Sequence, residues 1–234
     1  NRSAAKCTTI VTNSGLLIGH NEDYFEPGFQ DTICIVKKTI AGFTTLEIFY
    51  YNTLGGSSIG INSHGYLHAV NTLLYTSKQI GVPKSMIARL LLDTTNPERD
   101  LAFIQELSRA SGFSHLVTDE NGQIWHAEFT SKTAKISLPA LPFCHTNHCL
   151  IGKSGKSKRN IYGTDSRLRF AQRNTPRRTS VSQLQVLLDD RSQGTSKSLF
   201  NERTIGRMII DQKSELVMIW LLREKELGWI NYSI

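Results

Sequence analysis

"AAKCTTIVTNSGLLIGHNEDY", residues 4–24, decides the fold of this chain. A β-branched run follows Cys7, and a second apolar run covers residues 16–18. The turn signal Asn13-Ser14-Gly15 separates the two runs, so the stretch predicts two strands joined by a tight turn. The second strand leads into a polar cluster, residues 19–24. Because a hairpin places its strands side by side, we expect Cys7 at one outer end to face this cluster at the other.

The rest of the chain adds further hairpins and two separate blocks of helices. Turn signals predict strand pairs around residues 41–42, around Asn121-Gly122 and around residues 212–213. Helical spacing of apolar residues predicts helices over 83–95 and 97–110, and two more in "TDSRLRFAQRN" and "SVSQLQVLLDD". Strands and helices are therefore segregated. This order favours an α+β fold with layered antiparallel sheets over the regular alternation of nucleotide-binding folds.

Length and cysteine content limit the classes of protein. The 234 residues suffice for one sizeable domain with a buried core. No apolar run approaches the ~20 residues that a transmembrane helix needs, so no membrane span is expected. Four cysteines are too few for a disulfide scaffold, and they favour free thiols in a reducing compartment such as the cytoplasm, with a cell envelope or an organelle as the alternatives.

The net charge of +7 is concentrated in one segment. Residues 153–178 contain nine Lys or Arg residues and one acid, Asp165. Such a run can bind nucleic acid or another anion. The segment contains only two aromatic residues, Tyr162 and Phe170, so the aromatic interleaving expected of a single-strand binder is absent there. A solvated loop and helix face is therefore the favoured interpretation, and nucleic acid is not the expected partner.

Chemistry alone leaves two interpretations of Cys7. A catalytic cysteine needs a base to remove its proton, donors for the oxyanion and a group that orients the set. Seven histidines are available, so a Cys–His pair is possible by count. A lone cysteine beside a β-branched run is otherwise a small buried hydrophobic residue.

A resemblance to a known family favours the nucleophile. "CTTIVTNSGLLIGHNEDY" resembles the start of the mature N-terminal-nucleophile (Ntn) hydrolases whose nucleophile is cysteine. Further motifs of the acyl-coenzyme A:isopenicillin N acyltransferase-like group follow in order: "IGINSHGYLHAVNTL", "GVPKSMIARLLLDTTNP", "HAEFT", "HTNHCL" and "DSRLRF". The resemblance implies an αββα sandwich of two stacked antiparallel sheets, with residues 7–234 as the catalytic domain.

The same resemblance implies that the precursor cuts its own Lys6–Cys7 bond. The freed α-amine of Cys7 then serves as the base for the thiol, and its pKa near ~8 suits that role. We therefore expect residues 1–6 to be the remnant of a propeptide. Precursors in the family carry a longer segment there, which stays bound as a small subunit, so such a segment is an expected partner.

Roles are carried over from the family's motifs residue by residue. Cys7 is the nucleophile, and Asp23 is the carboxylate that orients the amine. Asn147, inside "HTNH", matches the side-chain oxyanion donor, and Arg169 matches the site arginine of the Asp-Ser-x-x-Arg element. Asn62 and Asn71 match site-lining asparagines, and each is either an oxyanion donor or a turn residue.

Two further points concern specificity and metals. His20 stands where the related bile-salt-hydrolase branch has arginine, which argues against the substrates of that branch. Cys144 and Cys149 lie beside two histidines, a grouping that can suggest zinc. Residues so close along one extended segment point alternately to opposite faces, so no metal site is expected.

The resemblance implies an enzyme that acts on linear amide bonds through a Cys7 thioester. Water as the second nucleophile gives an amidohydrolase, and an amine gives an acyltransferase. The expected substrate is a small amide or acyl compound, without a cofactor, although a coenzyme A thioester is a possible co-substrate. The alternative is a non-catalytic protein of the same fold, or one that binds anions or nucleic acid through residues 153–178.

Overall fold

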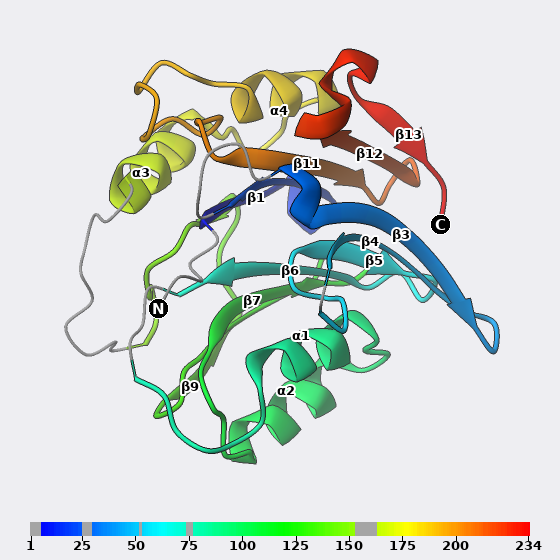
Figure 1. The fold of residues 1–234 in the computed structure, drawn as a ribbon, viewed down its shortest axis with the longest axis vertical. Helices are drawn as coiled ribbons and strands as arrows, with labels where there is room; N and C mark the ends of the chain where they lie inside the picture. The colour runs from blue at the N-terminus through cyan, green and yellow to red at the C-terminus, as the bar shows by residue number, and fades with distance from the viewer. Residues whose placement is uncertain (1–5, 25–29, 52, 74–76, 153–162) are drawn as a thin grey trace.

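The computed structural model describes residues 6–24, 30–51, 53–73, 77–152 and 163–234. Two antiparallel sheets lie face to face, and helices cover the outer face of each sheet (Figure 1). Helices α1 and α2 pack against one sheet, and α3 and α4 pack against the other. This arrangement confirms the predicted α+β sandwich of four layers.

The first sheet has six strands in the order β10-β1-β2-β11-β12-β13. Its strands are β1 (Lys6–Thr12), β2 (Leu17–Asp23), β10 (Phe143–His145), β11 (Thr204–Asp211), β12 (Leu216–Leu221) and β13 (Ile230–Tyr232). The second sheet has seven strands in chain order, β3 to β9. They are β3 (Ile33–Ile40), β4 (Phe43–Tyr50), β5 (Ile59–Asn62), β6 (Leu67–Thr72), β7 (Phe113–Thr118), β8 (Ile124–Phe129) and β9 (Ala134–Ser137).

The four α-helices are α1 (Lys84–Leu92), α2 (Pro97–Glu106), α3 (Thr164–Asn174) and α4 (Val181–Leu188). The predicted helices at 83–95 and 97–110 are confirmed, and each ends earlier than predicted. Asn96 caps α2 by accepting the Arg99 N–H, and proline occupies the first helical position. In the described part of the chain no helix is long and apolar enough to cross a membrane.

Three apolar layers hold the sandwich together. The inner layer lies between the sheets and includes Val11 and Ile18 from the first sheet and Leu46 and Leu116 from the second. A second layer packs α3 and α4 on the first sheet, and a third packs α1 and α2 on the second. Because every layer buries large side chains, both sheets are held firmly and can position residues at their strand ends.

The predicted hairpin of residues 4–24 is confirmed as β1 and β2. The turn Asn13–Gly15 keeps all three residues at positive φ, where glycine at the last position is unstrained. Cys7 pairs with Glu22, and Lys6 pairs with Asp23, so the cysteine does face the polar cluster. On its other side β2 pairs with β11, where Thr204 lies opposite Asp23.

Candidate active site

Cys7 lies near the start of β1 and is almost fully buried, with 2% of its surface exposed. Its backbone N–H donates to Asn147 Oδ1 at 3.2 Å. Its carbonyl oxygen accepts from the Arg167 guanidinium at 2.9 Å. Lys6 precedes it within the same strand, so the nitrogen of Cys7 is an amide and not an amine in this form of the chain.

The Cys7 thiol points to the inner side of the first sheet, where it meets Glu22. The thiol donates to Glu22 Oε1 at 3.2 Å. Three further side chains bind the same carboxylate: Tyr50 through its hydroxyl at 2.7 Å, Ser58 through its hydroxyl, and His20 through Nε2 at 3.0 Å. Glu22 is fully buried, so these contacts replace its solvation.

Asp23 follows Glu22 and points to the opposite face of the sheet, because side chains alternate along a strand. Its carboxylate accepts from Asn201 Nδ2 at 2.6 Å and from Thr204 Oγ1 at 2.7 Å. The Arg167 guanidinium lies 3.7 Å from Asp23 Oδ2. Arg167 comes from α3 and also donates to Thr8 Oγ1 and to Asn147 Oδ1, both at 2.7 Å.

Burial controls the electrostatics of this site. Burial first, and then the negative charges of Glu22 and Asp23, raise the pKa of the Cys7 thiol well above its usual value. The thiol is therefore protonated at neutral pH, and attack requires a proton acceptor. Burial also raises the pKa of Asp23 to about 6, although Arg167, Thr204 and Asn201 oppose the shift.

Asn147 and Asn71 both reach this region. Asn147 Nδ2 donates to the Thr72 carbonyl at 3.0 Å, while its Oδ1 accepts from Cys7 and Arg167. Asn71 Oδ1 accepts from Thr9 at 2.8 Å. Asn71 Nδ2 is buried and has no hydrogen-bond partner among the described residues, so it can donate to a developing oxyanion.

Two predicted site residues lie elsewhere. Asn62 ends β5, where Nδ2 donates to the carbonyls of Leu92 and Thr94 and Oδ1 accepts the N–H groups of His64 and Tyr66. These contacts are those of a turn residue. Arg169 is exposed on α3, and the arginine that contacts Cys7 is Arg167, two residues earlier.

His20 is buried within the network and does not lie on an open substrate surface. Its Nε2 faces Glu22 Oε2, and its Nδ1 lies 2.9 Å from Thr9 Oγ1. Thr9 gives its only hydroxyl proton to Asn71, so His20 Nδ1 must donate to Thr9.

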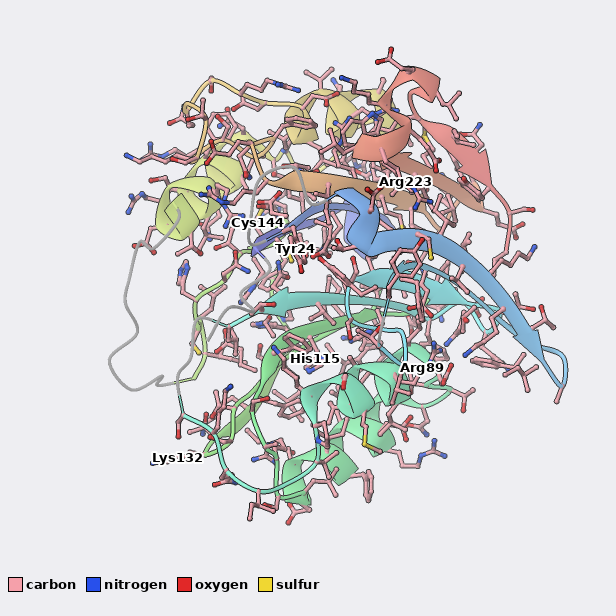
Figure 2. The ribbon with its side chains drawn as sticks, in the orientation of Figure 1. Tyr24, Arg89, His115, Lys132, Cys144 and Arg223 are labelled. Carbon is pink, nitrogen blue, oxygen red and sulfur yellow. The ribbon has the colours of Figure 1, made fainter. Side chains whose placement is uncertain are left out.

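Cys144 and His145 point to opposite faces, as their spacing predicts. Cys144, labelled in Figure 2, belongs to the apolar layer between the first sheet and helices α3 and α4, whereas His145 Nε2 lies 3.3 Å from Glu128 Oε1. Two other groups have ligand atoms close enough for a metal ion: Cys7 with His20 and Glu22, and His126 with Glu128 and His145. In the second group the backbone N–H groups of Leu150, Ile151 and Gly152 already bind the carboxylate.

Most of the described basic side chains of residues 153–178 are solvated, as predicted: Arg169, Arg173, Arg177 and Arg178 are exposed. Residues 153–162 lie outside the described residues, and with them four of the segment's nine basic side chains. Arg167 is fully buried against Cys7, while Arg169 is exposed. At least one positive charge of the segment therefore belongs to the Cys7 site.

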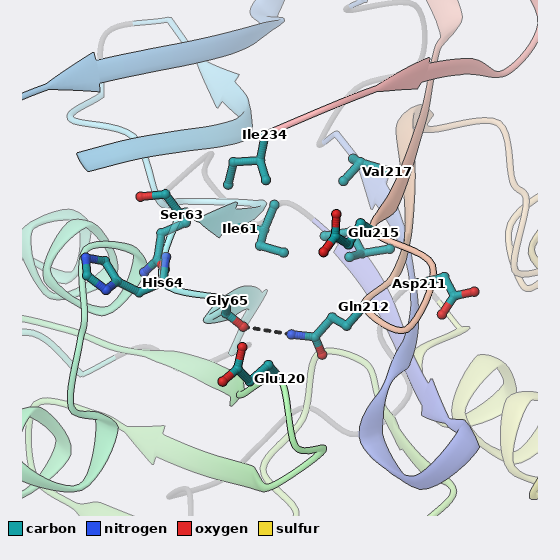
Figure 3. Close-up of a pocket in the computed structure, with 12 residues that line it drawn as sticks. Ile61, Ser63, His64, Gly65, Glu120, Asp211, Gln212, Glu215, Val217 and Ile234 are labelled. Carbon is teal, nitrogen blue, oxygen red and sulfur yellow. Dashed lines mark hydrogen bonds between the residues drawn. The ribbon is translucent and has the colours of Figure 1, made fainter. Parts of the chain in front are cut away.

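A cavity of about 340 Å³ opens at the other end of the first sheet (Figure 3). It lies between the β5–β6 turn and the β11–β12 hairpin, where Gln212 Nε2 donates to the Gly65 carbonyl at 2.8 Å. Asp211 on the cavity wall pairs with Leu17, the first residue of β2, whereas Glu22 lies at the far end of that strand. The cavity is therefore separate from the Cys7 site.

Glu22 and Arg167 are the site residues that sequence reasoning missed. The alternation of β2 places Glu22 on the same face as His20, and the hairpin register places it opposite Cys7. Thr164, Arg167, Leu168 and Ala171 form the buried stripe of α3 at helical spacing. Both signals are present in the sequence.

Two stacked antiparallel sheets between helical layers define the Ntn-hydrolase fold, and a buried cysteine at the start of a central strand is consistent with an enzyme of that class. Residues 11–217 match the family described as acyl-coenzyme A:6-aminopenicillanic acid acyl-transferase. The chain belongs to this family, and it is therefore an enzyme of the acyltransferase class. The matched region begins four residues after Cys7.

Solved structures share the fold at low sequence identity. A mutant of the conjugated bile acid hydrolase from Clostridium perfringens is 12% identical with a TM-score of 0.63, covering 98% of this chain and 92% of its own. The Caenorhabditis elegans ortholog of N-acylethanolamine-hydrolyzing acid amidase is 12% identical with a TM-score of 0.59. The match covers 88% of this chain and 92% of the amidase chain. Penicillin V acylase from Agrobacterium tumefaciens is 14% identical with a TM-score of 0.58. The match covers 97% of this chain and 86% of the acylase chain. No curated protein matches the chain.

Proposed function

We propose that this protein hydrolyses or transfers the acyl group of a small linear amide through a thioester on Cys7, after cutting its own Lys6–Cys7 bond. The observation that carries the proposal is the surrounding of Cys7. Its nitrogen is bound by Asn147, its carbonyl by Arg167 and its thiol by a carboxylate, all in one buried site. The names of the solved neighbours, a hydrolase, an amidase and an acylase, support the same reaction class.

The first step releases the nitrogen of Cys7. The thiol attacks the Lys6 carbonyl, the acyl group moves from nitrogen to sulfur, and water hydrolyses the thioester. Residues 1–6 leave with a carboxylate on Lys6, and Cys7 gains a free α-amine. Asn147 Oδ1, which accepts the amide N–H in the uncut chain, is placed to accept from that amine.

The mature site then works on substrate. The α-amine takes the thiol proton, sulfur attacks the substrate carbonyl, and the protonated amine returns the proton to the leaving amine. Asp23 and Arg167 hold the strand end and the amine in register. Water completes hydrolysis, whereas a second amine completes acyl transfer, with a coenzyme A thioester as one candidate acyl donor.

Intact-mass spectrometry of freshly purified protein tests this proposal. We expect the wild-type chain to lose residues 1–6, and the Cys7→Ala variant to keep them and to show no turnover of amide substrates. Cys7→Ser should cut slowly, because a hydroxyl is less acidic and less nucleophilic than a thiol. Asp23→Asn should lower turnover by weakening the hold on the amine. Cys34→Ser, on β3, is the matched control and should behave as wild type.

Iodoacetamide labelling with peptide mapping shows which cysteine reacts in the same samples. Cys7-dependent amidase activity in a chain that keeps residues 1–6 would contradict the α-amine mechanism.

A further inference from the structure

Glu22 is a buried acid that the proposed α-amine mechanism does not use. It lies directly opposite Cys7 in the β1–β2 register, on the inner face of the first sheet. The Cys7 thiol donates to Glu22 Oε1, at 3.2 Å. Among the described residues this is the acceptor that the thiol itself contacts.

The uncut chain needs an acceptor other than the α-amine. While Lys6 is attached, the nitrogen of Cys7 is an amide with no basic lone pair, and its N–H is already donated to Asn147. Asp23 points to the opposite face of the strand, where Asn201 and Thr204 hold its carboxylate. Burial among negative charges keeps the thiol protonated. Self-cleavage therefore requires a base in contact with the thiol before the amine exists.

We propose that Glu22 is the catalytic base that accepts the Cys7 thiol proton while the Lys6–Cys7 bond is intact. This inference rests on the proposed self-cleavage. It assigns the two stages of the protein's chemistry to two different bases: a carboxylate first, and the α-amine that the first stage produces afterwards.

The proton and electron balance of the step is complete without another reactant. Sulfur attacks the Lys6 carbonyl carbon as the thiol proton passes to Glu22 Oε1, and the carbonyl oxygen becomes an oxyanion. The oxyanion collapses, the C–N bond breaks, and the proton on Glu22 goes to the Cys7 nitrogen, which leaves as an amine. Water then hydrolyses the thioester and restores the thiol.

The remaining contacts hold Glu22 in position for this step. Tyr50 donates to Oε1, the oxygen that faces the thiol, and Ser58 donates to Oε2. His20 Nε2 contacts Oε2, and its other nitrogen is held by Thr9. These three are positioning residues, because they contact the carboxylate and act through it. Donors on both oxygens fix the orientation of the carboxylate, with Oε1 facing the thiol.

The test follows loss of residues 1–6 by intact mass over time, in the full chain. Glu22→Gln keeps the shape of the side chain but cannot act as a base. We expect it to slow cleavage by roughly 10²–10⁴-fold, the usual contribution of a general base. Glu47→Gln is the matched control. It neutralises another buried glutamate, which binds Arg89 and the Gly56 N–H instead of Cys7, and it should cleave at the wild-type rate.

A second variant covers the case in which Glu22→Gln fails to fold. Glu22→Asp keeps a carboxylate but withdraws it from the sulfur by one methylene. It should cleave at least tenfold more slowly than wild type and faster than Glu22→Gln. Cleavage of either folded variant at the wild-type rate overturns the proposal and leaves the proposed function standing.

Turnover by the wild-type chain separates the remaining outcomes. If it keeps residues 1–6 yet shows Cys7-dependent amidase activity, the α-amine function fails. In that case loss of activity in Glu22→Gln supports Glu22 as the base, and unchanged activity overturns it. A wild-type chain with neither cleavage nor Cys7-dependent turnover overturns both proposals.

Discussion

At the scale of single residues, Asn147 connects the nucleophile to the arginine. Its Oδ1 accepts from the Cys7 N–H and from Arg167, and its Nδ2 donates to Thr72. As the expected oxyanion donor it should also affect the rate. We predict that Asn147→Ala lowers turnover by roughly 10²–10³-fold. It should also lower the free energy of unfolding by about 1–3 kcal/mol, because buried donors lose their acceptor.

Asn62→Ala is the control for that prediction. Among the described residues, the Asn62 amide binds only backbone groups of the β5–β6 turn and the end of α1. The Asn62→Ala substitution should therefore destabilise the protein without lowering the turnover of the folded fraction. Urea unfolding and initial rates at saturating substrate measure the two effects separately. Unchanged turnover in Asn147→Ala would assign Asn147 a structural role alone.

The two arginines of α3 offer a matched pair. Arg167 is buried and binds the Cys7 carbonyl, Thr8 and Asn147, whereas Arg169 is exposed. We predict that Arg167→Met lowers the free energy of unfolding by about 3–5 kcal/mol, because Asp23 is left buried without its cation. Arg169→Met should change it by less than about 0.5 kcal/mol. Chemical denaturation at neutral pH compares them, and equal effects would contradict the assignment.

The sequence predicted the nucleophile and Asp23 from motifs, but it assigned the arginine by motif spacing alone. Residues 167 and 169 are about 200° apart around a helix, so only one can face the sheet. The stripe Thr164, Arg167, Leu168, Ala171 identifies which one. Glu22 was not predicted as a site residue, because no family motif includes it. Its role depends on strand register, which places it opposite Cys7.

At the scale of elements, two hairpin turns from different sheets touch. A Cβ on Gly122, in the β7–β8 turn, would lie 1.9 Å from the Ser14 carbonyl oxygen of the β1–β2 turn. A Cβ on Gly15 would lie 2.2 Å from the Gly122 oxygen. Both glycines are also at positive φ. The close approach of these backbones therefore requires glycine on each side.

Gly42 provides the control for this contact. Its φ is +82°, nearly the same as the +81° of Gly122, but nothing lies within 4 Å of its Cβ position. We predict that Gly42→Ala costs about 1 kcal/mol from backbone strain alone. Gly122→Ala should cost at least about 2 kcal/mol more, because backbone must move. Urea denaturation measures both, and equal losses would show that the turns can separate freely.

Local signals predicted these elements well, and they did not predict the pairing of distant strands. Asn121-Gly122 and Asn13–Gly15 mark their turns, and alternating apolar residues mark the strands beside them. No local signal in the chain pairs β2 with β11, whose residues Asp23 and Thr204 are 181 positions apart in sequence. Burial of the inner faces decides that pairing, and the family resemblance implied two stacked sheets without the order of their strands.

At the scale of the whole molecule, Glu128 connects the two sheets. It lies on β8 of the second sheet, and its carboxylate meets His145 on β10 of the first. Burial alone would raise its pKa. The contact with His145 and the N–H groups of Leu150 and Gly152 outweigh burial and lower the pKa of Glu128 to about 2. The ionised carboxylate therefore stabilises the folded state.

The sign of this effect gives a pH prediction. The pKa of Glu128 in the unfolded chain is near 4.5, above its folded value of about 2. Its contribution, on the order of 3 kcal/mol, is present above pH 4.5 and is lost as the pH falls toward 2. We predict that wild type is more stable than Glu128→Gln at pH 7 and that the difference disappears near pH 2. Denaturation at several pH values measures it.

Glu47→Gln should behave in the opposite way, because burial raises the pKa of Glu47. The free energy of unfolding of wild type should therefore rise relative to that of Glu47→Gln as the pH falls. A Glu128→Gln difference that stays constant from pH 7 to pH 2 would contradict the role of the ionised carboxylate.

The place of β1 inside its sheet has a consequence for the proposed mature enzyme. Once the Lys6–Cys7 bond is cut, the nucleophile is the terminal residue of a chain, and chain ends usually fray. Here β10 and β2 flank the strand on its two sides, and Asn147 and Arg167 bind the backbone of Cys7. The amide hydrogens of Thr8–Thr12 should therefore exchange with solvent only when the whole domain opens. The entropy of fixing the nucleophile is then lost once, during folding, and no substrate has to supply it at each turnover.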